Sequence, residues 1–324
     1  MQLTDLYSLN ATNKKEPGTA TALVSIVVAT HNGERFLKEQ LDSLVQQTYP
    51  HIEIIVVDDA SSDDTVSILK TYQSRYPHMR FYFNSETIGH VRNFEKGMQL
   101  AAGEYIALCD HDDIWMPAKI ERLISIIGDS DLAYCDSELI DDAGKSMKRK
   151  LSDIKNLRGY NSCLPYSIGN SVSGHSCLFH RRLLQRALPL NESVIHDWWL
   201  AFIGALRTEI KYTDEVLVLY RQHDKNLIGA VNQKGRKRRR DPNYEEVRHI
   251  RSRIIAFYER CPESNKEEKE VLKKMAECYR SFSLINNYRR MMLFMKHREH
   301  LLAIKKKSEF RKWLFCLKMF FKII

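Results

Sequence analysis

The sequence has few of the features that mark secreted, disulfide-stabilised or membrane-spanning proteins. Its seven cysteines are scattered, odd in number and without a Cys-x-x-Cys pair, which argues against a disulfide framework and a zinc site. The polar segment 1–21 contains no apolar core of signal-peptide length. No stretch approaches the roughly 18 uninterrupted apolar residues that span a bilayer. We therefore expect a cytoplasmic protein.

Acidic residues are almost missing from two segments of the chain. Residues 234–240 form one basic cluster, and in the tail a series of cations faces only Glu309: Lys305, Lys306, Lys307, Arg311, Lys312, Lys318 and Lys322. The chain of 324 residues has a net charge of +9 and an otherwise ordinary globular composition. Possible partners of the basic segments are nucleic acid, an anionic membrane surface or water.

The first part of the chain alternates apolar, strand-like runs with amphipathic helical segments. The apolar runs predict strands at residues 23–29, 52–57, 81–83 and 104–109. Helical spacing and capping residues predict helices at residues 34–47, from 61–63 to about 76, and at 92–102. This alternation is typical of a doubly wound parallel sheet.

Polar side chains follow the ends of the expected strands. They lie at residues 30–32, 58–59 and 110–113. In doubly wound sheets, ligands bind beyond the carboxyl ends of the strands, so these residues should meet at one edge. The pattern favours a nucleotide site.

The acidic cluster Asp110, Asp112 and Asp113 is the most informative of these groups. Three carboxylates at a strand end repel one another unless a cation neutralises them. Hard oxygen ligands suit Mg²⁺ or Mn²⁺, which commonly bridge to substrate phosphates. A solvated acidic loop is the alternative interpretation.

Beyond residue 117 the order of the expected elements becomes mixed. Strands are expected at residues 132–135, 173–180 and 216–220, a helix at 196–206, a polar loop at 141–165 and a basic linker at 231–243. From about residue 244 the chain is helical and rich in charge.

Several motifs follow one another in a specific order. They are Val-Ala-Thr-His-Asn-Gly at 28–33, Val-Val-Asp-Asp-Ala-Ser-Ser-Asp-Asp-Thr at 56–65, Gly-His-Val-Arg-Asn-Phe-Glu-Lys-Gly at 89–97, Asp-His-Asp-Asp at 110–113, His-Asp-Trp-Trp at 196–199 and Tyr-Arg-Gln-His at 220–223. With these motifs the chain resembles glycosyltransferase family 2, the inverting nucleotide-sugar transferases. The branch it resembles most contains rhamnosyltransferases of cell-surface polysaccharide assembly.

The resemblance implies an α/β protein of the GT-A fold, a Rossmann-like, mixed and mainly parallel sheet flanked by helices. The GT-A domain would cover residues 23–230, after a polar tail at 1–22. A basic loop at 231–243 would lead to a helical C-terminal region at 244–324, which ends in a basic amphipathic tail.

The resemblance also assigns nucleotide-binding roles. Asp59 would accept a hydrogen bond from the imide N–H of uracil or thymine. The other residues expected to bind the nucleotide are Thr30, Asn32, Glu34, Arg92, Asn93 and Asp110. A turn aspartate and a surface arginine are the alternative interpretations of Asp59 and Arg92.

Asp112 is the expected main ligand of Mn²⁺ or Mg²⁺, with Asp113 and His223 also at the metal. A surface loop histidine is the alternative interpretation of His223. Asp197 is the expected catalytic base, although an aspartate before a helix is also an ordinary N-cap. The expected donor and acceptor pocket contains Gly174, His175, Trp198, Trp199 and Arg221. Both tryptophans could instead belong to the core.

The expected substrates are a UDP- or dTDP-sugar, with dTDP-rhamnose as one candidate, and a lipid-linked polyprenyl diphosphate glycan in O-antigen or capsule synthesis.

In the tail, aromatic and aliphatic side chains alternate with lysines, which is typical of a helix on an anionic membrane surface. We therefore expect the protein to bind at the inner membrane face. The alternative is a terminal helix packed on the domain. A sugar nucleotidyltransferase is the second candidate function. A nucleic-acid-binding protein ranks third, because the acidic strand ends would repel the phosphates of a nucleic acid.

Overall fold

The computed structural model describes residues 22–77, 79–224, 226, 244–281 and 283–321. The expected basic loop at 231–243 lies outside these residues, as do the polar segment 1–21 and the last residues of the tail, 322–324.

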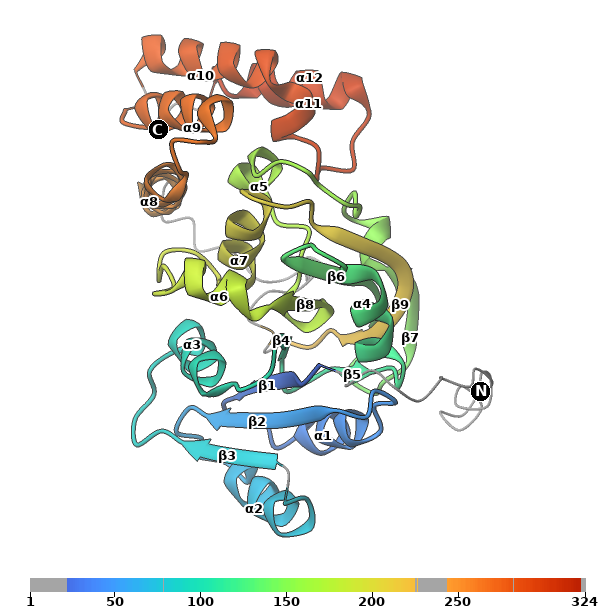
Figure 1. The fold of residues 1–324 in the computed structure, drawn as a ribbon. Coiled ribbons are helices and arrows are strands. Elements are labelled where there is room, and N and C mark those ends of the chain that lie inside the picture. Colours follow the sequence, from blue (N-terminus) through green and yellow to red (C-terminus); the bar gives the residue numbers. More distant parts are fainter. Residues whose placement is uncertain (1–21, 78, 225, 227–243, 282, 322–324) are drawn as a thin grey trace.

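A nine-stranded sheet forms the centre of the molecule, in the order β3-β2-β1-β4-β8-β6-β9-β5, with β7 paired to β6 (Figure 1). The strands are β1 (Val24–Thr30), β2 (Ile52–Asp58), β3 (Met79–Phe83), β4 (Tyr105–Cys109), β5 (Ile114–Trp115), β6 (Leu132–Ile140), β7 (Ser146–Lys150), β8 (Cys177–His180) and β9 (Lys211–Arg221). β1 to β4 are parallel, and β8 runs antiparallel between β4 and β6. The expected mixed, mainly parallel sheet is confirmed.

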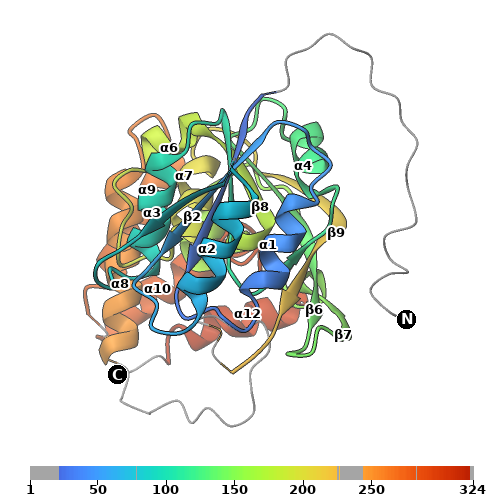
Figure 2. The ribbon, with the colours of Figure 1, turned by 90° about the horizontal axis from the view of Figure 1, so that it is seen from below.

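Helices cover both faces of this sheet. One face packs against α1 (Leu37–Val45), α2 (Thr65–Arg75) and α4 (Lys119–Ile127), and the other against α3 (His90–Leu100), α6 (Arg181–Ala187) and α7 (His196–Ala205). Figure 2 shows α1 and α3 on opposite sides of β2. Neighbouring β1 residues Ile26 and Val27 belong to different cores. Because both faces are buried, the strands appear as continuous apolar runs in the sequence.

A layer of helices follows the sheet and packs on its α7 side. It consists of α8 (Tyr244–Arg260), α9 (Lys266–Cys278), α10 (Leu284–Lys296), the short α11 (Arg298–Leu301) and α12 (Glu309–Lys318), shown in orange and red in Figure 1. The expected helical C-terminal region is confirmed. No described helix is both long and apolar enough to cross a membrane.

After α11 the chain returns to the sheet domain. Asn156 donates its backbone N–H to the carbonyl of Ile304 at 3.0 Å and its side-chain amide to the carbonyl of Ala303 at 2.9 Å. Lys155 and Lys305 form an antiparallel bridge. These bonds bring residues from the end of the chain beside a loop in its middle.

The sequence prediction was wrong for residues 141–165, which were expected to form a loop. They contain β7, a 3₁₀ turn at Leu151–Asp153 and the start of α5 (Leu164–Ile168). Every β7 side chain is exposed and several are lysine or arginine, so the sequence contains no apolar alternation from which this strand could be predicted. The expected strand at 173–180 begins only at Cys177, because Gly174–Ser176 form a 3₁₀ turn.

Candidate active site

A cavity of about 1330 Å³ opens at the carboxyl ends of β1, β2 and β4. On the sheet side it is lined by the loops that follow these strands. On the other side it is lined by the 3₁₀ turn at Gly174–Ser176, the first residues of α7 and the segment 304–307. The cavity therefore joins the expected nucleotide edge to the C-terminal layer.

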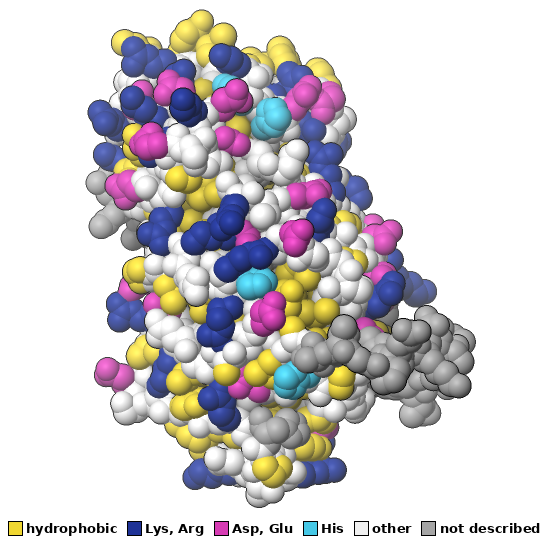
Figure 3. Space-filling model, in the orientation of Figure 1, with side chains coloured by type: hydrophobic (Ala, Val, Ile, Leu, Met, Phe, Trp, Pro, Cys, Tyr) yellow, Lys and Arg dark blue, Asp and Glu magenta, His cyan; other side chains and the backbone are white. Residues whose placement is uncertain are grey.

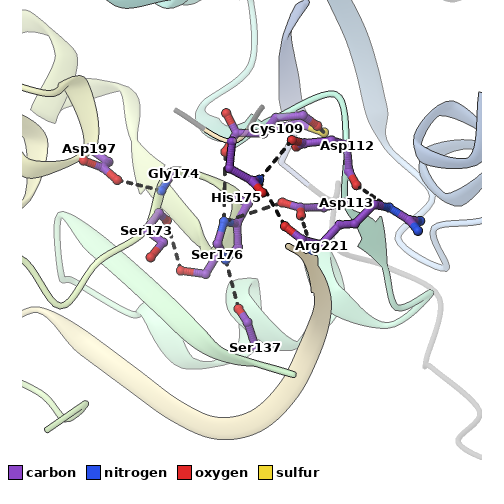
Figure 4. A network of polar contacts seen from close by, with 12 residues as sticks. Cys109, Asp112, Asp113, Ser137, Ser173, Gly174, His175, Ser176, Asp197 and Arg221 are labelled. Carbon is purple, nitrogen blue, oxygen red and sulfur yellow. Dashed lines mark hydrogen bonds and ion pairs between the residues drawn. The ribbon is translucent and has the colours of Figure 1, made fainter. Parts of the chain in front are cut away.

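The three aspartates after β4 point in different directions. Asp110 reaches into the cavity, where 40% of its side chain is accessible, whereas Asp113 is fully buried. Asp110, Asp113 and His175 bring one ligand atom each within 4.8 Å of one another. The close-up in Figure 4 shows His175 beside Asp113, with its other ring nitrogen on Ser137.

Electrostatics in this group favour a cation. Burial, with the charges of Asp112 and Asp197, raises the pKa of Asp110 to about 8. Burial and the two neighbouring aspartates raise the pKa of Asp113 well above its ordinary value. Burial also lowers the pKa of His175 to about 3, so the imidazole is neutral and has a lone pair to offer. One oxygen of Asp113, Oδ2, is buried without a hydrogen bond to the described residues.

Asp112 makes a separate pair with the histidine after β9. Nε2 of His223 lies 2.8 Å from Oδ2 of Asp112, and both residues line the cavity. Burial acts to raise the pKa of Asp112, but the hydrogen bond from His223 and the charge of His111 outweigh it and lower that pKa. The two atoms are close enough to be neighbouring ligands of one ion, because Mg²⁺–oxygen bonds of about 2.1 Å place adjacent ligands about 3 Å apart.

Arg221 ties these aspartates to β9. Its backbone N–H donates to Asp113 at 3.0 Å, and its Nε donates to the carbonyl of Asp112 at 2.9 Å. The guanidinium is buried, pairs with Glu39 and lies over the ring of Phe36. Arg221 therefore positions the acidic loop but does not line the cavity.

Asp197 lies in the first turn of α7 and faces the cavity. Ile195 holds the N-cap position, so the carboxylate of Asp197 is not the helix cap. It accepts hydrogen bonds from Asn170 at 3.1 Å and from the amide of Gly174 at 3.0 Å. Figure 4 shows the second of these bonds. Burial raises the pKa of Asp197 to about 6, although nearby Lys155 and these hydrogen bonds act to lower it. A carboxylate with that pKa can accept a proton near neutral pH.

The nucleotide half of the cavity is held by a dense hydrogen-bond network around Asp59. Its carboxylate accepts from Asn84, from the amide of Ile88 at 2.8 Å and from the amide of Gly89 at 2.9 Å. A carboxylate has about four acceptor sites, so one position remains for a donor from a ligand. Asn93 joins the same network through Asn84 and the carbonyl of Val57.

The remaining residues expected at the nucleotide meet in the loop after β1. Thr30 lines the cavity, and its buried hydroxyl has no hydrogen-bond partner among the described residues. Asn32, at a positive φ of 49°, and Glu34 bind the backbone of Ser62 and Asp64 in the loop after β2. Both also line the cavity.

Some of the expected site residues do not face the cavity. Arg92 pairs with Glu192 on the surface, as its alternative interpretation proposed. Trp199 is 3% exposed, bonds the carbonyl of Ala187 and stacks on Phe257 in the core. Asp113 and Arg221 are buried and do not line the cavity.

Trp198 does line the cavity, beside Gly174 and His175. Its indole N–H donates to the carbonyl of Tyr166, and the guanidinium of Arg253 lies 4.1 Å from the centre of its ring.

Sequence reasoning missed the lysines on the far side of the cavity. Lys155 comes from the middle of the chain, and Lys305, Lys306 and Lys307 come from the loop between α11 and α12. These four residues are called the basic wall below, and Asp59, Asp110 and Asp112 are called the acidic wall. In the sequence the three C-terminal lysines are part of a basic segment whose possible partners are nucleic acid, a membrane surface or water, and their spacing gives no signal of a return to the sheet.

This arrangement has the fold of the GT-A glycosyltransferases. The crystal structure of S. aureus TarS in complex with UDP-GlcNAc has a TM-score of 0.56 and 18% identity, and the match covers 92% of this chain and 80% of TarS. The mannosyltransferase PcManGT from Pyrobaculum calidifontis, solved with GDP-Man and Mn²⁺, has a TM-score of 0.56 and 17% identity, covering 94% and 86%. At these identities the likeness shows the fold alone.

Sequence comparison identifies the family within this class. The model of Glycosyl transferase family 2 matches residues 25–188. An uncharacterized glycosyltransferase of Rickettsia typhi is 31% identical over 223 residues, which cover 66% of this chain and 69% of the relative. One from Nostoc is 25% identical over 218 residues, covering 63% and 66%. The chain belongs to glycosyl transferase family 2; these matches do not bear on the expected rhamnosyltransferase branch.

Proposed function

We propose that this protein is an inverting, metal-dependent glycosyltransferase that moves a sugar from a UDP- or dTDP-linked donor to a lipid-linked glycan. The observation that carries the proposal is the cavity between the acidic wall and Asp197. It combines carboxylates suited to a metal–diphosphate group with a separate carboxylate whose pKa is raised to about 6. dTDP-rhamnose and a surface polysaccharide such as O-antigen or capsule remain the candidate donor and pathway.

The base of the nucleotide binds beside Asp59 in this proposal. The free acceptor position of that carboxylate matches the imide N–H of uracil or thymine. Thr30, with its unpartnered hydroxyl, and Asn93 line the same part of the cavity. Uracil and thymine differ by a methyl group that leaves this hydrogen bond unchanged, so both donors remain candidates.

The proposed metal ligands are Asp112 and His223, with Asp110 and Asp113 supporting. Asp112 and His223 both line the cavity, where their side chains can meet a substrate phosphate. Mg²⁺ sites usually have one or two protein carboxylates, with substrate phosphates and water as the other ligands. A divalent cation there would offset the negative charge on the departing diphosphate. The group Asp110, Asp113 and His175 is the alternative ligand set.

Asp197 acts as the general base. The acceptor hydroxyl attacks the anomeric carbon from the face opposite the diphosphate, and the bond from that carbon to the diphosphate oxygen breaks. The hydroxyl proton passes to Asp197, and the nucleoside diphosphate leaves. The hydrogen bonds from Asn170 and Gly174 fix the orientation of the carboxylate.

The test of this function is turnover of a panel of UDP- and dTDP-sugars by the purified protein, with Mn²⁺ and with EDTA. We expect hydrolysis or transfer of at least one donor that depends on the metal. Equal turnover in EDTA would remove the metal from the proposal. Absence of turnover for every donor, with and without membrane extract as the source of acceptor, would refute the function.

The C-terminal layer supports association with an anionic membrane. The large hydrophobic side chains exposed on it are Leu284, Ile285, Tyr288 and Met292 from α10, and Phe310, Trp313, Leu314 and Phe321 from α12 and the residues after it. Figure 3 shows hydrophobic side chains along the upper edge of the molecule with lysines and arginines beside them. α12 is also packed on the domain, because Cys316 and Met319 are buried. The helix therefore has one packed face and one apolar exposed face, which suits an interfacial position.

Flotation with vesicles that contain phosphatidylglycerol tests this surface. Deletion of residues 310–324 should move the protein to the soluble fraction, but it also removes buried Cys316 and Met319. Trp313→Glu combined with Leu284→Glu changes only exposed positions and should also abolish flotation. Met147→Glu, at an exposed position on β7, is the matched control and should still float. Flotation of the double variant would contradict the proposal.

A further inference from the structure

A second, smaller hollow adjoins the large cavity on the side of the C-terminal layer. It has a volume of about 490 Å³ and lies beside the start of α12. This basic groove is lined by Asn156, Lys305, Lys306, Lys307, Ser308, Arg311 and Lys312. Every charged side chain among these residues is cationic.

The lining of the groove contains five cationic side chains and no carboxylate among the described residues. Lys312 pairs with Glu309 at 2.8 Å, whereas Lys306 donates to a neutral acceptor, the carbonyl of Ser152, at 2.7 Å. The ammonium groups of Lys305 and Lys307 lie 5.1 and 5.5 Å from the centre of the Phe315 ring. Cations that line one groove repel one another, and an anion that bound among them would relieve the repulsion.

The groove is built on a fixed backbone. Lys305 bridges to Lys155, and Asn156 holds the carbonyls of Ala303 and Ile304. The hydroxyl of Ser308 accepts the amide of Arg311 as the cap of α12. The lysine side chains therefore extend from a main chain whose position is set by hydrogen bonds.

The basic groove adjoins the active-site cavity. Lys305, Lys306 and Lys307 line both hollows and so form their shared boundary. Lys155, next along the wall, is close enough to Asp197 for the two charges to interact. A row of cations thus leads from the expected base to the groove.

We propose that the basic groove binds a phosphate or diphosphate group of the acceptor while an acceptor hydroxyl reaches Asp197 in the cavity. This inference rests on the proposed function and deepens it by giving the phosphate of the acceptor a binding site. Because the acidic wall on the other side repels an anion that comes without a metal, the two phosphate-bearing substrates are kept apart. The donor binds with its cation at one wall, and the acceptor phosphate binds directly to lysines at the other.

The size of the groove favours one phosphate group over an extended polyanion. A hollow of about 490 Å³ accommodates a diphosphate with part of its attached chain. A nucleic acid would also need a basic track over many phosphates and aromatic platforms for its bases. The carboxylates of the acidic wall, on the opposite side of the cavity, would interrupt a basic track of that length.

The probes are inorganic pyrophosphate and farnesyl diphosphate, titrated calorimetrically into the full chain in EDTA. EDTA keeps cations off the acidic wall, so anion binding reports on the groove. We expect Lys306→Ala combined with Arg311→Ala to weaken both affinities by roughly tenfold or more, because each replaced side chain removes a charge-assisted hydrogen bond. Lys145→Ala combined with Arg149→Ala, on the exposed β7 hairpin, removes the same charges elsewhere and should leave both affinities unchanged.

The outcomes separate this inference from the proposed function. Pyrophosphate affinity that is equal in the groove variant and the wild type would overturn the inference, whatever the turnover of nucleotide sugars. Loss of affinity in the groove variant alone supports it, even if no donor is turned over. Tighter binding of farnesyl diphosphate than of pyrophosphate assigns the phosphate to a lipid-linked acceptor, and equal binding assigns it to a soluble one. Farnesol that binds as tightly as farnesyl diphosphate would also overturn the inference.

Discussion

The acidic and basic walls of the cavity differ in how their charged groups are held. On the acidic wall, Asp59 accepts three hydrogen bonds from the protein, and Asp112 is paired with His223. On the basic wall, Lys306 and Lys307 are exposed; Lys306 donates to a backbone carbonyl, and Lys307 lies over an aromatic ring. The acidic wall is preorganised for one ligand geometry, whereas the lysines can adapt to an anion.

This difference suits two substrates with unequal demands. Transfer requires the anomeric carbon and the leaving diphosphate to be held in a defined geometry, which a rigid wall provides. An acceptor anchored by a phosphate at some distance from its reacting hydroxyl needs attraction more than exact geometry. Asp197 interacts with a residue of each wall: its charge acts to raise the pKa of Asp110, and the charge of Lys155 acts to lower the pKa of Asp197.

The largest expected effect is that of Asp197→Asn. The amide keeps the shape of the side chain but cannot take the proton, so transfer should fall by roughly 10²–10⁴-fold. Asp129→Asn, at an exposed position outside the cavity, is the matched control and should retain full activity. The measurement is the initial rate of glycan formation at saturating donor. Unchanged transfer by Asp197→Asn would remove it as the base.

A pair of histidine variants decides between the two metal sets. Replacing His223 with Ala removes one proposed ligand and should weaken Mn²⁺ activation by about 10- to 100-fold, whereas His175→Ala should have a smaller effect. The measurement is the Mn²⁺ concentration for half-maximal donor turnover. If His175→Ala weakened Mn²⁺ activation more than His223→Ala, the ion would be assigned to the group of Asp110, Asp113 and His175 instead.

The pH dependence of transfer should follow Asp197. Its pKa of about 6 lies above the ordinary value because of burial, so activity should rise with pH through an inflection near 6. Transfer at pH 5 should then be about one tenth of its plateau, because only that fraction of the carboxylate is ionised.

The variant Lys155→Met tests whether the basic wall influences the pKa of Asp197. The lysine acts to lower the pKa of Asp197, so its removal should move the inflection to higher pH. The pH profile of initial rates measures this shift. An inflection at the same pH in the variant would show that the basic wall does not act on the base.

The smallest expected effect is on thermal stability. The raised pKa values of Asp110 and Asp113 mean that the folded, metal-free protein retains protons there that the unfolded chain releases, so these groups destabilise the fold as the pH rises toward 8. Mn²⁺ competes with those protons and should raise the Tm more at pH 8 than at pH 6. Differential scanning fluorimetry measures both gains, and a larger gain at pH 6 would contradict this account.

The acidic wall could be predicted from the sequence because its information is local. Asp59, Asp110 and Asp112 each lie just beyond a buried apolar strand, and parallel strands bring such positions to one edge. The basic wall could not be predicted in the same way. Lys305 meets Lys155 through a bridge between segments far apart in the chain, and no periodicity in either segment encodes that pairing.

The errors in the expected site have a similar origin. Trp199 and Trp198 are adjacent in the sequence, but only the way α7 is turned against Phe257 decides which of them enters the core. Arg92 is on the surface because α3 presents it to Glu192. Motifs indicate which residues lie near a site, while side-chain packing determines which of them face it.

A crystal structure with Mn²⁺ and UDP, with the ion located by its anomalous scattering, tests the division of the cavity most directly. We predict Mn²⁺ between Asp112 and His223, the phosphates on the ion and the uracil beside Asp59. Phosphates bound to Lys305, Lys306 and Lys307, with no ion on the acidic wall, would contradict the account.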